Sequence, residues 1–94
     1  MPLPESALTS SSLPRLWHVA RLDFDPVRQQ HVLLYPEGTL LLNETGAAIL
    51  ELCDGGRSVA AIAGILGVRY QRDVTADVIE YLSGLAERDL IRDS

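Results

Sequence analysis

The sequence predicts an α+β domain in which a three-stranded antiparallel sheet is followed by three helices. Three observations lead to this fold class. Residues 19–42 contain three short apolar segments separated by proline-containing turns, which is the pattern of a β-meander. From residue 43 onward, apolar residues recur at helical spacing between glycines and polar capping residues. With 94 residues, the chain has the length of one domain with one modest core.

The three predicted strands follow one another closely. In residues 19–25 apolar and polar residues alternate, as they do in a half-buried strand. Asp25-Pro26 then begins a tight turn, since Asp is favoured at the first position and Pro at the second. A second strand is predicted at about residues 29–35, and a third at the apolar run of residues 40–42.

Three helices are predicted after the strands. Asn43 has the chemistry of an N-cap for the first helix, and Gly55-Gly56 follows its end. Ser58 is the predicted cap of the second helix, which we expect to stop at Gly67. The third and longest helix is expected to begin near Asp73.

Composition limits the classes of function. Residues 1–13 are rich in Ser and Pro and predict a disordered tail, which leaves residues 14–94 as the folded domain. The net charge of −5 disfavours nucleic acid as a partner. No apolar run approaches the roughly 20 residues of a membrane span, and the first residues lack the pattern of a signal peptide. We therefore expect a cytoplasmic protein that does not bind membranes.

No catalytic or metal-binding constellation can be assembled from these residues. His18 and His31 have no cysteine or carboxylate at metal-ligand spacing. Cys53 falls on the apolar face of the first helix, where a buried structural thiol is expected. Asp23 and Asp25 flank a turn and are read as solvated surface. We predict a non-catalytic protein without a metal or cofactor.

Interaction chemistry remains as the candidate function. The third strand would be an edge if the sheet is a simple meander, and an edge strand can pair with another chain. The third helix carries apolar residues across roughly 160° of its circumference, more than one sheet needs. Either the margin at Val74 and Tyr81 or that at Ile79 and Ala86 is a candidate for exposure. Alternatively, the first two helices cover both margins.

Several short segments carry a family resemblance through their order and spacing. These are Asp25-Pro-Val-Arg28, Leu33-Leu-Tyr-Pro-Glu-Gly38, Leu42-Asn-Glu-Thr-Gly46, Ile49-Leu-Glu-Leu-Cys-Asp-Gly55, and Asp77-Val78 followed by Leu82 and Leu85. Over about residues 14–92 the sequence thereby resembles the PqqD family of pyrroloquinoline quinone (PQQ) biosynthesis.

The resemblance implies a specific partner. Proteins of this family bind the precursor peptide PqqA and present it to the radical S-adenosylmethionine (SAM) enzyme PqqE, which joins a Glu and a Tyr of the peptide. In related domains the peptide adds as a strand beside the third strand and lies against the third helix. Carried onto this chain, the peptide-binding residues would be Thr39, Leu40, Leu41, Leu42, Val74, Val78, Tyr81, Leu82 and Leu85.

Three alternatives stay open at this point. The chain could recognise another ribosomally made peptide, because such recognition domains share the fold. It could also be a winged-helix DNA-binding protein, since the order of its elements is winged-helix-like. The third helix, however, carries Asp73, Asp77, Glu80 and Glu87 against Arg72 and Arg88, a balance that repels the phosphates of DNA. Finally, an apolar edge could form a homodimer.

Overall fold

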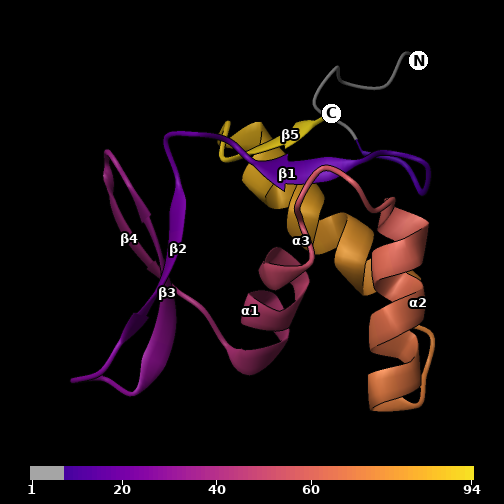
Figure 1. The fold of residues 1–94 in the computed structure, drawn as a ribbon, viewed down its shortest axis with the longest axis horizontal. Coiled ribbons are helices and arrows are strands. Elements are labelled where there is room, and N and C mark those ends of the chain that lie inside the picture. Colours follow the sequence, from indigo (N-terminus) through magenta and orange to yellow (C-terminus); the bar gives the residue numbers. More distant parts are fainter. Residues whose placement is uncertain (1–7) are drawn as a thin grey trace.

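The structure, a computed structural model, describes residues 8–94 and contains the predicted three-stranded sheet and three helices (Figure 1). The antiparallel sheet has the order β2-β3-β4. Its strands are β2 (Arg21–Asp25), β3 (Gln30–Tyr35) and β4 (Gly38–Leu41). The helices are α1 (Glu44–Glu51), α2 (Val59–Tyr70) and α3 (Thr75–Glu87). The sheet lies at one side, and the helices form the body of the domain beside it.

A second, two-stranded sheet was not predicted. It pairs β1 (Pro14–Leu16) with β5 (Ile91–Asp93) in antiparallel register, at the end of the molecule where the chain terminus marked C lies (Figure 1). Trp17 follows β1, and the guanidinium carbon of Arg92 lies 4.1 Å from the centre of its ring. The tryptophan therefore lies at the end of the two-stranded sheet, where a cation–π contact holds it.

Residues 8–13 differ from the predicted disordered tail. Leu8 packs in the core. The carbonyl oxygens of Ser10 and Ser12 accept hydrogen bonds of 2.9 Å from the backbone N–H groups of Ala60 and Val59. The first N–H groups of a helix lack partners within the helix, so this segment completes the start of α2. Residues 1–7 lie outside the described part of the chain, and the prediction made for them stays a prediction.

The core lies between the helices and one face of the sheet. Leu33 of β3, Ile62 and Leu66 of α2, and Leu82 of α3 are all completely buried there. Cys53 is buried as predicted, and its thiol donates to the carbonyl oxygen of Ile49 at 3.3 Å. Burial, and secondarily the charge of Asp54, raises the pKa of this thiol to about 12, so it stays neutral.

The helix starts follow the predicted capping chemistry. The side chain of Asn43 accepts a hydrogen bond from the N–H of Gly46 at 2.7 Å, and that of Ser58 accepts from Ala61 at 3.0 Å. At α3 the N-cap position is Val74, and the Asp73 carboxylate one residue earlier accepts from the N–H of Thr75 at 2.9 Å. The cap at Asn43 starts α1 immediately after β4, because only Leu42 and Asn43 separate the two elements.

The second helix does not stop at Gly67, as the sequence predicts. It continues to Tyr70 and ends at Gln71, which adopts the left-handed conformation with φ 55°. The glycine nevertheless serves this end, since its carbonyl oxygen accepts a hydrogen bond from the N–H of Arg72 at 3.1 Å. A Cβ at Gly67 would lie only 3.1 Å from the Arg72 carbonyl oxygen. Gly67 therefore permits the carbonyl group of Arg72 to approach α2 closely, one turn before the helix ends.

Candidate functional site

The free edge of β4 presents backbone groups of two residues. The N–H of Leu42 donates to the carbonyl oxygen of His31 at 3.0 Å, and the register pairs Leu33 with Leu40 and Leu34 with Thr39. In an antiparallel pair, hydrogen-bonded and non-hydrogen-bonded residues alternate. The backbone of Leu40 therefore points toward β3, whereas the N–H and C=O groups of Thr39 and Leu41 point away from the sheet.

The side chains of β4 divide between the two faces of the sheet. Leu40 lies on the same face as Leu33 and packs against the core. Thr39 and Leu41 lie on the opposite, outer face, and both are exposed. A strand added at this edge would therefore bond to the backbone of residues whose side chains face outward.

Tyr81 holds α3 against the start of α1. A Cβ placed on Gly46 would lie 2.6 Å from the Tyr81 hydroxyl oxygen, so the glycine leaves room for the ring. Burial, and secondarily Cys53, raises the pKa of the Tyr81 hydroxyl, which therefore stays neutral. Since only two residues separate α1 from β4, this contact connects the middle of α3 to the helix that follows the edge strand.

Arg88, just beyond the last residue of α3, makes a second contact with the sheet. Its guanidinium donates a hydrogen bond of 2.6 Å to the hydroxyl oxygen of Tyr35 and lies 5.3 Å from the centre of that ring. Tyr35 is the last residue of β3 and is paired with Gly38 at the start of β4. The two contacts therefore tie α3 to α1, which follows β4, and to Tyr35, which is paired with the first residue of β4.

A shallow hollow of about 510 Å³ lies along α3 between these two contacts. Tyr81, Gly84 and Leu85 supply its less polar part, and Asp77, Glu80 and Arg88 supply its charges. The glycine leaves the middle of the hollow open, because no atom lies within 4 Å of a Cβ built there. The arrangement can accept side chains of an extended segment but contains no nucleophile with an adjacent base.

The structure separates the nine predicted site residues into two groups. Leu42, Val74, Val78 and Leu82 have exposed fractions of 3% or less and belong to the core. They present no surface: Leu42 follows β4, and Val74, Val78 and Leu82 belong to the start and the buried side of α3. Thr39, Leu40, Leu41, Tyr81 and Leu85 lie on the β4 edge or line the hollow.

Sequence reasoning missed Tyr35, Gly84 and Arg88 as parts of this site. Gly84 and Arg88 follow Tyr81 and Leu85 at helical spacing on the same side of α3, which is a signal that the sequence does contain. The contact between Tyr35 and Arg88 joins residues far apart in the chain. Local periodicity carries no signal for such a contact.

The profile of the family described as Coenzyme PQQ synthesis protein D (PqqD) matches residues 30–91, which include β3, β4 and all three helices. The chain belongs to the PqqD family. Within this family, "PqqA binding protein" of Azotobacter vinelandii is 41% identical over 88 residues, which cover 92% of this chain and 96% of the relative. A "PqqA binding protein" of Rhodopseudomonas palustris is also 41% identical, over 94% of this chain and 89% of the relative.

PqqD sequences also occur within longer proteins. "Bifunctional coenzyme PQQ synthesis protein C/D" of Methylorubrum extorquens is 43% identical over 89 residues, which are 92% of this chain but only 24% of that protein. A solution NMR structure of the PqqD truncation of Methylobacterium extorquens PqqCD matches with a TM-score of 0.79 and 42% identity, covering 93% of this chain and 96% of that one. That truncation is described as a functional, stand-alone recognition element for ribosomally synthesized and post-translationally modified peptides (RiPPs).

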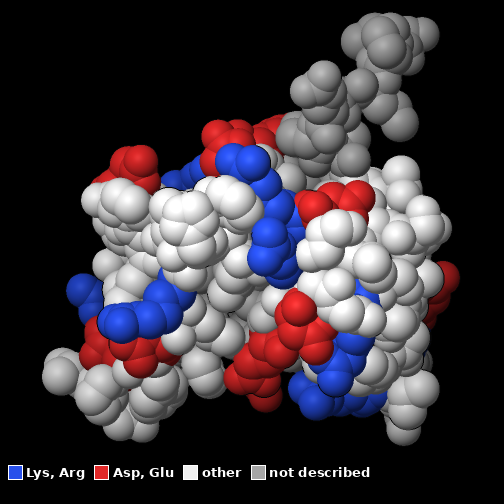
Figure 2. All heavy atoms as spheres, turned by 45° about the horizontal axis from the view of Figure 1, so that its top comes forward, with Lys and Arg blue, Asp and Glu red and all other residues white. Residues whose placement is uncertain are grey.

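The charges of this PqqD chain form no continuous basic surface on the face shown in Figure 2, where arginines, the only basic residues besides histidine in the sequence, lie beside Asp and Glu. Residues 8–94 contain no cluster of three or more His, Cys, Asp or Glu that could hold a metal ion. No helix in the same residues is long and apolar enough to span a membrane.

Proposed function

We propose that this PqqD-family chain binds the precursor peptide PqqA by strand addition at β4 and presents it to the radical SAM enzyme PqqE, as a non-catalytic accessory protein of the cytoplasm. The names of its relatives support the peptide as partner. The observation that carries the binding mode is the free edge of β4, at which the backbone groups of Thr39 and Leu41 point away from the sheet.

The hollow on α3 supports the same mode of binding. In strand addition, backbone hydrogen bonds supply affinity and pockets for alternate side chains supply selectivity. Tyr81 and Leu85 would contact apolar side chains of the peptide, and Asp77, Glu80 and Arg88 would select charged neighbours. Because both signs of charge line the hollow, we expect recognition of a specific order of side chains rather than of net charge.

Calorimetric titration of the chain with synthetic PqqA tests this proposal. Thr39→Pro removes one N–H from the free edge without removing a hydrogen bond to β3, which is where proline is tolerated in a sheet. We expect this variant to bind PqqA more weakly, by roughly five- to a hundredfold. Thr39→Val keeps the N–H and should bind as the wild-type chain does. Equal affinity of both variants would exclude strand addition at β4.

Presentation to PqqE requires a separate experiment. Formation of the Glu–Tyr cross-link in PqqA would be followed by mass spectrometry with PqqE alone, with added wild-type chain and with Thr39→Pro. We expect the wild-type chain to increase product formation and the proline variant to lose this effect in proportion to its weaker binding. A cross-link yield that does not depend on the added chain would contradict presentation while leaving peptide binding intact.

The same free edge favours a homodimer as the second candidate function. Two β4 strands could pair with each other because each offers unpaired N–H and C=O groups. Sedimentation equilibrium over a range of concentrations distinguishes the two functions. Self-pairing at β4 predicts that added PqqA dissociates the dimer, whereas a chain that stays monomeric without peptide leaves the edge free for PqqA.

A further inference from the structure

We infer that the outer face of the sheet is a second recognition surface, which takes an aliphatic side chain of the strand bound at β4. The inference rests on the proposed function, because the occupant is the same bound peptide. It concerns the side of that peptide turned away from α3. The outer face carries a hollow of about 550 Å³, separate from the one on α3, and its lining includes Val32, Leu34, Thr39 and Leu41.

The floor of this outer hollow is apolar and ends at the free edge. Val32 of β3 and Leu41 of β4 are directly paired, so their side chains are neighbours on the same face. The exposed fraction is 5% for Val32 but 46% for Leu41. The apolar row of Val32 and Leu41 thus extends to β4, the edge strand. Its outermost side chain, that of Leu41, is only about half buried and lies on the strand to which a further strand would add.

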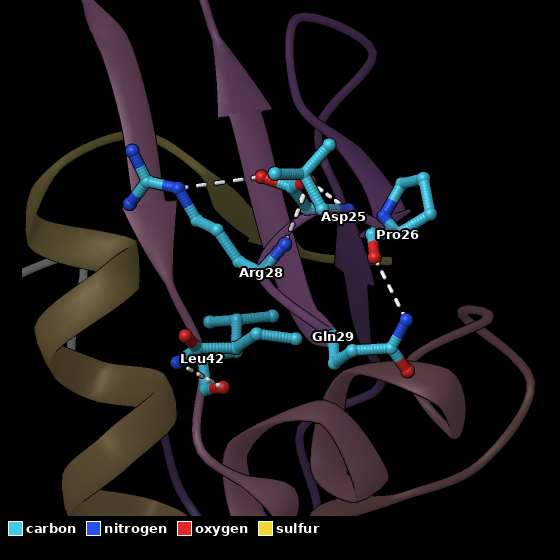
Figure 3. A network of polar contacts seen from close by, with 7 residues as sticks. Asp25, Pro26, Arg28, Gln29 and Leu42 are labelled. Atoms are coloured by element: carbon cyan, nitrogen blue, oxygen red, sulfur yellow. Dashed lines mark hydrogen bonds and ion pairs between the residues drawn. The ribbon is translucent and has the colours of Figure 1, made fainter.

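The charged rim of the outer hollow is already paired. The Asp25 carboxylate accepts hydrogen bonds from the N–H groups of Val27 and Arg28 and lies 3.4 Å from the Arg28 Nε (Figure 3). On β2, Arg21 and Asp23 form an ion pair of 3.6 Å. The lining includes Asp23, Asp25 and Arg28, whereas Arg21 lies outside it. Each of the two carboxylates thus already has an arginine beside it. An uncharged, apolar group is therefore the chemistry that the adjacent row of Val32 and Leu41 fits.

Strand geometry brings such a group to Leu41. Successive side chains of a strand point to opposite faces, so every second residue of the bound peptide lies on the outer face. Neighbouring strands lie about 4.8 Å apart, and directly opposite side chains contact each other. The peptide residue beside Leu41 extends the row that begins with Val32. An aliphatic side chain at this position covers Leu41, whereas the adjacent peptide residues face α3.

The test compares Leu41→Gln with Val27→Gln in calorimetric titrations with PqqA. Val27 is the matched control because it is 91% exposed in the turn between β2 and β3 and does not line the outer hollow. We expect Leu41→Gln to weaken binding about five- to tenfold, since it removes an apolar contact of partial burial. Val27→Gln should leave the affinity unchanged.

A direct measurement on the wild-type chain keeps the inference testable even if Leu41→Gln folds poorly. With isotope-labelled protein and unlabelled PqqA, nuclear Overhauser effects should connect the Leu41 methyl groups with methyl protons of a peptide residue. Absence of such contacts in a saturated complex would overturn the inference. So would an affinity of Leu41→Gln equal to that of the wild type.

The outcomes also separate this inference from the proposed function. If Thr39→Pro weakens binding and Leu41→Gln does not, strand addition stands and the outer recognition surface is refuted. If the wild-type chain does not bind PqqA, both fail. If Leu41→Gln mainly lowers self-association, measured by sedimentation, and leaves PqqA affinity unchanged, the outer face serves a second copy of the chain and the inference is overturned.

Discussion

The two edges of the three-stranded sheet, β2 and β4, differ in what they offer to another chain. On β4, the outward backbone groups belong to Thr39 and Leu41, and the strand carries no charged side chain. On β2, the register directs the backbones of Leu22 and Phe24 outward, and the N–H of Phe24 already donates to the Asp23 carboxylate at 2.8 Å. The edge at β2 is thus partly satisfied and charged, which protects it from pairing. One meander contains a protected edge and an open one.

Proline substitution on each edge gives the largest expected difference. Thr39→Pro removes an outward donor of β4, and Leu22→Pro removes an outward donor of β2 at a residue that does not line the outer hollow. We expect only the β4 variant to lose PqqA affinity, by about 1–3 kcal/mol. Leu22→Pro also removes a partly buried side chain that packs against the core, so it should reduce stability by about 2 kcal/mol while binding normally. Calorimetry and urea unfolding measure the two effects, and weaker binding by both variants would erase the distinction between the edges.

A methyl group added at Gly46 of α1 should displace Tyr81 of α3 and thereby weaken peptide binding. Gly46→Ala places a Cβ against the Tyr81 hydroxyl, and we expect a loss of about 1–2 kcal/mol in the free energy of unfolding together with weaker PqqA binding. Gly64→Ala is the matched control in α2, where no atom lies within 4 Å of the added Cβ. That variant should gain about 0.5–1 kcal/mol from helix propensity. Equal stabilisation of both variants in urea unfolding would show that Tyr81 does not pack on Gly46.

A smaller effect is expected from the hydroxyl that joins β3 to α3. Tyr35→Phe removes the acceptor of the Arg88 hydrogen bond and keeps the ring. The contact is exposed, so we expect a stability loss of about 0.5 kcal/mol and a modest decrease in PqqA affinity as the hollow loosens. Tyr70→Phe in α2 removes the same group away from the sheet and should not change binding. The two affinities are compared by calorimetry, and a decrease in both would point to a general effect of the missing hydroxyl.

The smallest expected effect tests the protected edge itself. Asp23→Ala frees the N–H of Phe24 and removes the partner of Arg21. Because both groups are exposed, stability should change by only a few tenths of a kcal/mol. Hydrogen exchange at the Phe24 amide should become faster, and self-association should rise with concentration in sedimentation. Glu87→Ala on α3 removes the same charge without opening an edge, and an equal rise in association there would attribute the effect to net charge.

Much of the fold follows from local signals in the sequence. The turns at Asp25-Pro26 and Pro36 to Gly38 mark the meander, and Asn43 and Ser58 mark two helix starts that the structure confirms. The strands β1 and β5 are each only three residues long and pair across almost the whole chain. Neither has enough residues to show a period, so their pairing could not be predicted from the pattern.

The candidate site was predictable in its elements but not in its side chains. The run from Leu40 to Leu42 indicates an apolar strand, but a shift of one residue in register exchanges the two faces. Only the pairing with β3 shows that Leu40 faces the core and Leu41 faces outward. Likewise, the apolar period of α3 does not reveal that Val78 and Leu82 are covered by other helices while Tyr81 lines a hollow.

The pairing of β1 with β5 has a consequence for the order of folding. Pro14 is opposite Asp93, so this pairing closes a loop of nearly the entire chain. By contrast, β2, β3, β4 and α1 follow one another without long connections. Closing a long loop adds little to the equilibrium cost, about 0.6 kcal/mol for each doubling of length, but contacts that are distant in sequence form slowly. We therefore expect the meander to assemble before the two ends of the domain meet, so that the open edge is present in the chain earlier than the finished fold.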